Sequence, residues 1–225
     1  VPQELRAELD ARIRDWLAQV QFVGCNGLEV RDEMRLVVAA QACIVALGLE
    51  REAFGQLHGV NLYPDEFWVH ETDVDEDTGV VTEGGRALAG QTVAADRIVL
   101  SWRDVEDAAT RQDGYNVVVH EVAHYLDHAG GGRASAPGGP FDAEYEALCD
   151  AVDRGEDTLL DPYGAEDRVE FLAVAAELFF EQPRRLRRQH PALYASLAQA
   201  FRLDPAAWPP PRAGRHLDEP ASPAG

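Results

Sequence analysis

The sequence predicts an α+β protein that is mainly helical and contains a small β-sheet. Segments near both ends repeat apolar residues at three- and four-residue steps, which is the spacing of one helix face. Between residues 49 and 110 the sequence changes to short β-branched and aromatic clusters, such as FWV at 67–69 and IVL at 98–100. Because Asp, Gly and Thr interrupt these clusters, we expect short strands there.

Six helices are expected along the chain. The first spans residues 3–20, where apolar residues alternate with charges in an amphipathic pattern. The second spans residues 33–47 and is more apolar, with Gly48 where a C-terminal cap is expected. The other four are expected near residues 113–128, 141–153, 166–181 and 190–202.

One domain over residues 1–205 and a Pro-rich tail over residues 206–225 account for the chain. The 225 residues suffice for a single hydrophobic core. The prolines beyond Trp208 predict disorder in the tail. The acidic segment 73–77, followed by Thr78 and Gly79, predicts a hairpin turn. A calcium loop is the alternative, but the segment lacks the glycine and terminal glutamate of that motif.

The charge of the chain argues against nucleic acid and membranes as partners. The formal net charge is −20 and the isoelectric point is about 4.6. Such a surface repels phosphate backbones and anionic lipid headgroups. The longest apolar stretch, residues 36–49, is shorter than the ~20 residues of a membrane-spanning helix.

The cysteines favour a reducing compartment, and we expect the protein in the cytoplasm. Cys25, Cys43 and Cys149 are too few and too scattered for a disulfide framework, so each is expected to be a small buried side chain. The chain begins at Val1 without a basic and apolar leader. We therefore expect either a missing N-terminal piece or a trimmed start.

Residues 120–124 read HEVAH, the pattern in which two histidines on one helix bind zinc. Chance would produce about 0.02 such windows in a chain of this composition. Four residues advance a helix by ~6 Å and about one turn, so His120 and His124 lie on the same face. Glu121 lies about 100° further round, where it can act on a water molecule without binding the metal.

A catalytic zinc site needs a third protein ligand and an open position. His128 lies ~12 Å along the helix axis from His120, too far to share one ion, and is expected to be a helix-end residue. The extension that would supply a third histidine is absent, because Asp127 and Gly130 occupy the positions where it needs glycine and histidine. Several glutamates remain as candidates: Glu144, Glu146, Glu166, Glu170, Glu177 and Glu181.

Two of these glutamates lie in an almost wholly apolar segment. Glu170 and Glu177 are seven residues apart and share one helix face. A buried carboxylate without a partner is costly, so each should face a cation or a metal. The pattern does not choose between them.

The sequence resembles the Mlc titration factor A family of bacterial zinc peptidases, whose metal site is similar to that of the anthrax lethal factor protease domain. The resemblance covers about residues 1–205 and rests on NVVVHEVAHYLD, DEMRLVVAAQACIVALG, RIVLSWRDV and a tyrosine seven residues before a glutamate in EFLAVAAELFF. It implies a zincin-like fold of the gluzincin type. It also implies that Glu170 is the third zinc ligand and that Tyr163 faces the reacting carbonyl. Glu177 would then support the site or form a salt bridge, with Glu144 and Glu146 as lower-ranked ligands.

The resemblance therefore predicts a peptidase with one Zn²⁺ per chain, in which Glu121 is the general base. Its substrates would be peptides, possessing a free N-terminus if the enzyme is an aminopeptidase. The alternative is a regulatory protein that sequesters a transcriptional repressor of glucose uptake, with peptidase activity secondary. A purely structural zinc would need more cysteine or histidine ligands than the chain supplies.

Some residues have two interpretations. Asp127 could hold a ligand imidazole or remain solvated at the helix end, and Asn116 could cap the helix or line the cleft. The arginines at positions 184, 185, 187 and 188 could be solvated charges or a docking patch for an acidic partner. Val122 and Tyr125 stand where the family has an aromatic residue and a lysine, and residues 130–139 are rich in glycine. These departures concern the substrate groove more than the metal.

Overall fold

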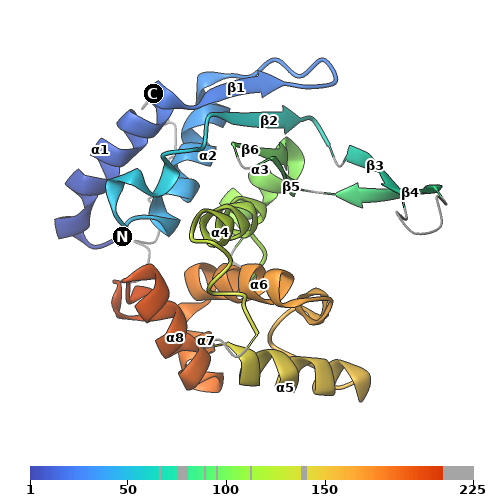
Figure 1. The fold of residues 1–225 in the computed structure, drawn as a ribbon. Helices are drawn as coiled ribbons and strands as arrows, with labels where there is room; N and C mark the ends of the chain where they lie inside the picture. Colours follow the sequence, from blue (N-terminus) through green and yellow to red (C-terminus); the bar gives the residue numbers. More distant parts are fainter. Residues whose placement is uncertain are drawn as a thin grey trace, which may run out of the picture.

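The computed structural model describes residues 1–65, 67–74, 81–88, 90–94, 96–111, 113–137 and 141–209. Within these residues the fold is α+β and mainly helical, as the sequence predicts (Figure 1). No helix in these ranges is both long and apolar enough to cross a membrane.

A small sheet lies at one end of the molecule, with strand order β1–β2–β6–β5. The first three strands, β1 (Gln21–Gly24), β2 (Gly59–Tyr63) and β6 (Arg97–Ser101), are parallel, and β5 (Gly90–Ala94) runs antiparallel to β6. A separate antiparallel pair consists of β3 (Phe67–Val74) and β4 (Val81–Leu88). The turn expected after Asp73 would join these two strands, but residues 75–80 lie outside the described residues.

The helices follow the predicted segments closely. They are α1 (Gln3–Gln19), α2 (Asp32–Val45), α3 (Trp102–Thr110), α4 (Val117–Ala129), α5 (Asp142–Asp153), α6 (Arg168–Glu181), α7 (Pro183–Gln189) and α8 (Pro191–Phe201). The sequence did not predict α3, α7 or strand β1. Helix α4 begins four residues later than expected, because Gly114 has φ of +103° and Asn116 has extended backbone angles.

Gly48 has a different role from the expected helix cap. Helix α2 ends at Val45 with Ala46 as its cap residue. A Cβ atom on Gly48 would lie 2.3 Å from the carbonyl oxygen of Phe201 and 2.6 Å from that of Arg202. Glycine is therefore required here because the chain passes close to the end of α8.

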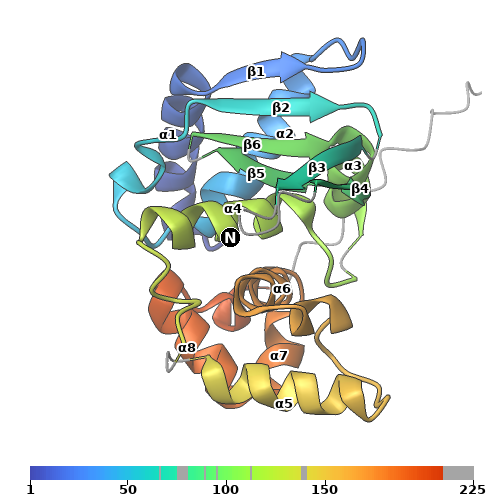
Figure 2. The same ribbon diagram turned by 45° about the vertical axis from the view of Figure 1, so that its right-hand side comes forward.

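Helix α4 lies in the middle of the molecule (Figures 1 and 2). The sheet, α1 and α2 lie on one side of it, and α5 to α8 lie on the other. Val118 and Val122 of α4 and Ala173 and Ala176 of α6 are all fully buried. Because both helices contribute to one apolar core, their polar side chains are held in fixed positions relative to each other.

The segment after α8 is held against the helices as far as Trp208. Residues Pro205–Ala207 form a short 3₁₀ helix in which Ala206 is buried. Arg184 of α7 donates hydrogen bonds to the carbonyl oxygens of Ala206 and Trp208. The tail predicted from residue 206 thus begins inside this turn, and residues 210–225 lie outside the described residues.

Candidate metal centre

The start of α4 is fixed by Asn116. Its side-chain oxygen accepts hydrogen bonds from the backbone N–H groups of Val118 and Val119, both at 3.1 Å. This satisfies two of the N–H groups that a helix leaves without partners at its start. The cap sets the rotation of the helix, and His120 and His124 then follow on its inner face.

The start of α6 is fixed in the same way by Asp167. Its carboxylate accepts from the backbone N–H groups of Val169 at 2.7 Å and Glu170 at 2.9 Å. Glu170 therefore lies in the first turn of α6, where the helix dipole favours a negative charge.

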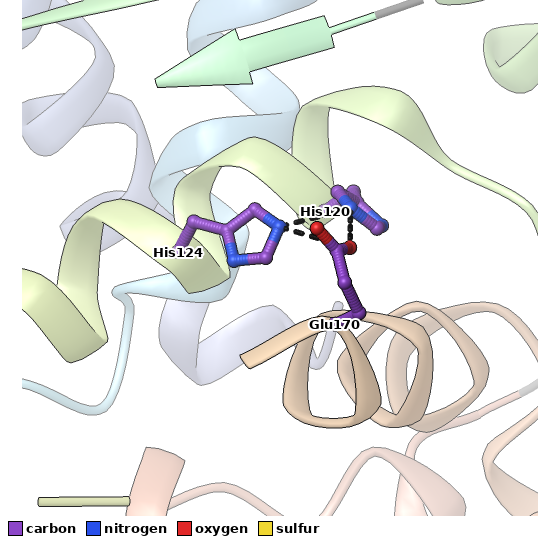
Figure 3. Close-up of side chains that lie close together, drawn as sticks. All are labelled: His120, His124 and Glu170. Atoms are coloured by element: carbon purple, nitrogen blue, oxygen red, sulfur yellow. Dashed lines mark hydrogen bonds and ion pairs between the residues drawn. The ribbon is translucent and has the colours of Figure 1, made fainter. Parts of the chain in front are cut away.

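Three candidate ligands from these two helices converge on one point (Figure 3). The Nε2 atoms of His120 and His124 are 3.0 Å apart. Oε2 of Glu170 lies 3.1 Å from Nε2 of His120 and 3.3 Å from Nε2 of His124. In the described part of the chain this is the group of His, Cys, Asp and Glu side chains with the spacing of a metal site.

The spacing of the three atoms suits a tetrahedral zinc ion. Zinc bonds of about 2.1 Å separate neighbouring ligand atoms by about 3.4 Å. The three observed separations, 3.0, 3.1 and 3.3 Å, come within a few tenths of an ångström of that value. Two imidazoles and one carboxylate leave a fourth position for water, as in catalytic rather than structural zinc sites.

Glu177 holds His120 from the opposite side of its ring. Its Oε1 atom lies 2.7 Å from Nδ1 of His120, and its Oε2 accepts from the backbone N–H of Asn116 at 2.5 Å. A proton on Nδ1 directed at Glu177 leaves the lone pair of Nε2 facing Glu170 and His124. Metal-binding histidines usually have such a partner, and only about 3% of the Glu177 surface is exposed.

The carboxylates change the proton affinity of the site. Burial alone would lower the pKa of His120, but hydrogen bonds to Glu170 and Glu177 raise it to about 10. Burial would raise the pKa of Glu170, but its bonds to the two imidazoles lower it. Burial raises the pKa of Glu177 despite the imidazole beside it. The site thus favours positive charge, and a divalent cation would replace the proton.

Glu121 and Tyr163, the residues expected to act on substrate, both lie near His120. Glu121 is buried at about 3% exposure, and its charge contributes to the raised pKa of His120. The ring of Tyr163 lies 6.1 Å from that of His120, between ring centres. Tyr163 is held in the short 3₁₀ helix Pro162–Ala165, where Asp161 accepts from its backbone N–H.

Other candidate residues lie elsewhere or do something different. His128 is exposed in the last turn of α4, as expected. Glu144 pairs with Nδ1 of His190 at 3.0 Å, and Glu146 is exposed on α5. Asp127 accepts hydrogen bonds from the backbone of Ala134 and from the backbone and hydroxyl of Ser135. It fixes the loop after α4, so the interpretation that it holds an imidazole is wrong.

The arginines of α7 have mixed roles. Arg184 binds the segment after α8, and Arg187 lies 3.8 Å from the carboxylate of Asp204 and over the ring of Tyr194. Arg185 donates to the side chain of Gln182 at 3.0 Å. At least two of the four are thus built into the structure.

Sequence reasoning missed one contact in this region. Glu181 accepts from the side-chain amide of Asn116 at 2.8 Å, so Asn116 joins two glutamates of α6. The four-residue spacing of Glu177 and Glu181 was a signal that both face the same neighbour.

Comparison with known proteins gives one family. The model for the glucose-regulated metallo-peptidase M90 family matches residues 1–202. The uncharacterized protein slr2042 of Synechocystis sp. is 37% identical over 217 residues, covering 91% of this chain and 78% of its own length. Mlc titration factor A of Edwardsiella ictaluri is 32% identical, with coverage of 88% and 80%, and that of Serratia proteamaculans is 32% identical, with 85% and 77%.

Proposed function

The chain belongs to the glucose-regulated metallopeptidase family M90, and from this premise we propose that it is a zinc-dependent peptidase. The observation that carries the proposal is the convergence of His120, His124 and Glu170 on one point. A zinc ion held by these side chains would lower the pKa of its water from about 15.7 towards 7 and polarise a substrate carbonyl.

Glu121 is the general base in this proposal. It follows His120 directly on α4 and is therefore beside the site without being part of the ligand group. Its carboxylate would accept a proton from the attacking water and return it to the departing amine. Its burial supports this role, because a carboxylate removed from bulk water is a stronger base.

Tyr163 would stabilise the negative charge that develops on the carbonyl oxygen. A phenol near the ligand histidine can donate a hydrogen bond to that oxygen. The hydrogen bond from its backbone to Asp161 holds the short helix in place, so little reorganisation is needed during the reaction. Glu177 keeps the His120 ring in one orientation throughout.

The first experiment is hydrolysis of an amino-acid p-nitroanilide by the purified protein. We expect release of p-nitroaniline with zinc, loss of activity after chelation, and recovery when zinc is restored. Activity that is unaffected by chelation, or absent with one zinc bound per chain, would contradict the proposal.

A variant separates chemistry from metal binding. Glu121→Gln should retain one zinc per chain and lose about 10²- to 10⁴-fold in kcat, because the general base is removed. The matched control is Glu146→Gln, which alters an exposed glutamate of α5. Equal activity in the two variants would remove Glu121 from the mechanism.

We further propose that the peptidase acts at free N-termini, as the family resemblance implies. The test compares an amino-acid anilide with its N-acetylated form. An aminopeptidase cleaves the first much faster than the second, whereas similar rates would indicate an endopeptidase.

The second candidate function is binding of a transcriptional repressor of glucose uptake. The name of several relatives, Mlc titration factor A, favours it. The test is titration of the purified chain with purified Mlc in a calorimeter, using Glu121→Gln to exclude cleavage. Saturable binding at 1:1 stoichiometry would support this function, and the absence of heat would contradict it.

We also assign the protein to a reducing compartment such as the cytoplasm. The three cysteines are free thiols, and only Cys43 is buried. Fractionation of cells that express the chain tests this assignment.

A further inference from the structure

A cavity of about 710 Å³ lies away from the three candidate metal ligands, none of which lines it. Its walls come from the starts of α1 and α4, from α2, from the end of α6, and from α7 and the segment after α8. Figures 1 and 2 show α4 between the two groups of elements that these walls combine. The volume falls within the range of small-molecule sites.

The charged residues of the cavity have both signs. Arg6 of α1 and Arg184 and Arg185 of α7 line it, and so does Glu181 of α6. Arg184 donates to two backbone carbonyl oxygens, whereas Arg185 donates through one nitrogen to the side chain of Gln182. Arg6 and the other nitrogens of Arg185 are therefore the better placed donors for a ligand. Glu181 accepts a hydrogen bond from Asn116, and a carboxylate has further lone pairs for another donor.

The rest of the lining is mixed, because four side-chain amides, those of Gln3, Gln41, Asn116 and Gln182, lie among apolar side chains. Ile44, Val119, Phe180 and Trp208 contribute to it, together with three prolines. A ligand that fills this space would bury apolar surface at about 25 cal/mol per Å². The apolar part of the lining therefore favours a ligand with a hydrocarbon side chain over a bare ion.

A ligand must match all of these features. A simple anion would meet the carboxylate of Glu181, and a simple cation would meet three guanidinium groups. An ionised group without a partner is costly to desolvate, so a molecule with one charge of each sign fits best. We propose that this cavity is a second binding site, for a free amino acid with an apolar side chain. Its carboxylate pairs with Arg6 or Arg185, and its ammonium group pairs with Glu181.

The cavity is connected to the metal centre by hydrogen bonds. Glu181 accepts from the Asn116 side chain at 2.8 Å, and the Asn116 backbone N–H donates to Glu177 at 2.5 Å. Glu177 in turn lies 2.7 Å from Nδ1 of His120. An ammonium group that binds Glu181 shares its carboxylate with Asn116 and weakens that hydrogen bond, so we expect the bound amino acid to change the affinity of His120 for metal.

The test is calorimetric titration of the metal-free protein, because chelation removes any binding of an amino acid to the metal itself. L-leucine is the probe. The two comparison compounds are 4-methylpentanoate, which lacks the ammonium group of leucine, and 3-methylbutylamine, which lacks its carboxylate. We expect L-leucine to bind at one site per chain, at least about tenfold more tightly than either comparison compound. No saturable binding of leucine, or equal affinity for the three compounds, would overturn the proposal.

Two charge reversals on the same helix locate the site. Arg185→Glu should weaken leucine binding by about tenfold or more. Arg188 is exposed on α7 but does not line the cavity, so Arg188→Glu should change the dissociation constant of leucine by less than about twofold. Both side chains are exposed, so neither change threatens the core. Equal weakening in both variants would point to the general field of α7 and overturn the assignment.

Glu181→Gln tests the ammonium partner. The substitution keeps an oxygen for Asn116 and removes the charge, so leucine should bind more weakly while 4-methylpentanoate does not. Leucine affinity that is unchanged in this variant would exclude Glu181 as the ammonium partner.

The connection to His120 is tested with zinc. Saturating leucine should change the zinc dissociation constant by about fivefold or more, and zinc should change the leucine constant by the same factor. A zinc constant that is the same with and without leucine would overturn the connection. None of these measurements depends on peptidase activity, so they can fail while the proposed function holds.

Discussion

His120 combines two contacts in one ring, because its nitrogens face different carboxylates. Nε2 faces Glu170 of the candidate ligand group, and Nδ1 faces Glu177. The HEVAH spacing was enough to predict that the side chains of His120 and His124 lie together on one face of α4. The partner of Glu177 could not be predicted, because only the packing of α6 on α4 brings Glu177 to Nδ1. The choice of Glu170 came from the family resemblance and not from the residue pattern.

Removing the charge of Glu177 should loosen the metal without removing a ligand. In Glu177→Gln the amide presents an N–H group to one of two donors, the His120 ring or the Asn116 backbone. We expect zinc affinity to fall about 10- to 100-fold, as is common when the partner of a metal-binding histidine is changed. Competition with a chromophoric chelator measures this change.

The matched control for that measurement is Glu144→Gln. Glu144 also faces Nδ1 of a histidine, His190, at a distance of 3.0 Å, but away from the candidate ligand group. The zinc affinity of Glu144→Gln should equal that of the unaltered protein. Similar losses in both variants would mean that Glu177 has no special relation to the metal.

At the level of elements, the caps of α4 and α6 position the three candidate ligands. Asp167→Ala should lower the free energy of unfolding by about 0.5–2 kcal/mol, because two N–H groups of α6 lose their acceptor. Glu170 lies in the same turn, so zinc affinity should fall as well. Urea unfolding of the metal-free protein measures the first effect, and chelator competition measures the second.

Asp153→Ala is the control for the α6 cap. Asp153 is exposed at the end of α5, where a negative charge opposes the helix dipole. Its removal should leave stability unchanged or slightly higher. If Asp153→Ala lowered the free energy of unfolding as much as Asp167→Ala does, the role of the α6 cap would be contradicted.

Long periodic elements were predictable, and short ones were not. Helices α1, α2, α5, α6 and α8 lie within two residues of their expected ends. Helix α3 has nine residues and follows strand β6 directly, within a segment whose composition predicts strands. Helix α7 has only seven residues, which is too short for a clear periodic pattern. Strand β1 has four residues, and its formation depends on pairing with β2. Local patterns carry little information about such pairing.

At the level of the whole molecule, a metal ion would bridge the two helices that join the halves of the fold. Zinc should therefore stabilise the protein. At pH 8, a free zinc concentration 100 times the dissociation constant should raise the free energy of unfolding by about 2.7 kcal/mol. For a chain of this size that corresponds to a rise in Tm of about 5–10 °C. Calorimetry with and without chelator measures the difference.

The stabilisation should depend on pH with a definite sign. Without metal the pKa of His120 is raised to about 10, so its proton stabilises the fold at low pH and this contribution is lost as pH rises through that value. Zinc must displace the proton, so zinc affinity rises about tenfold per pH unit below that pKa for one proton released. At the same free zinc concentration, the stabilisation of the fold by zinc falls from about 2.7 kcal/mol at pH 8 to about 0.4 kcal/mol at pH 6. A zinc effect that is equal at both pH values would contradict the displacement of a proton.

The central claim is that two imidazoles of α4 and one carboxylate of α6 share a single zinc ion. Anomalous diffraction at the zinc absorption edge, from a crystal grown with zinc, tests it most directly. We expect one peak at about 2.1 Å from Nε2 of His120, Nε2 of His124 and the carboxylate of Glu170. A zinc peak elsewhere, or a peak at the histidines with Glu170 turned away, would contradict the account.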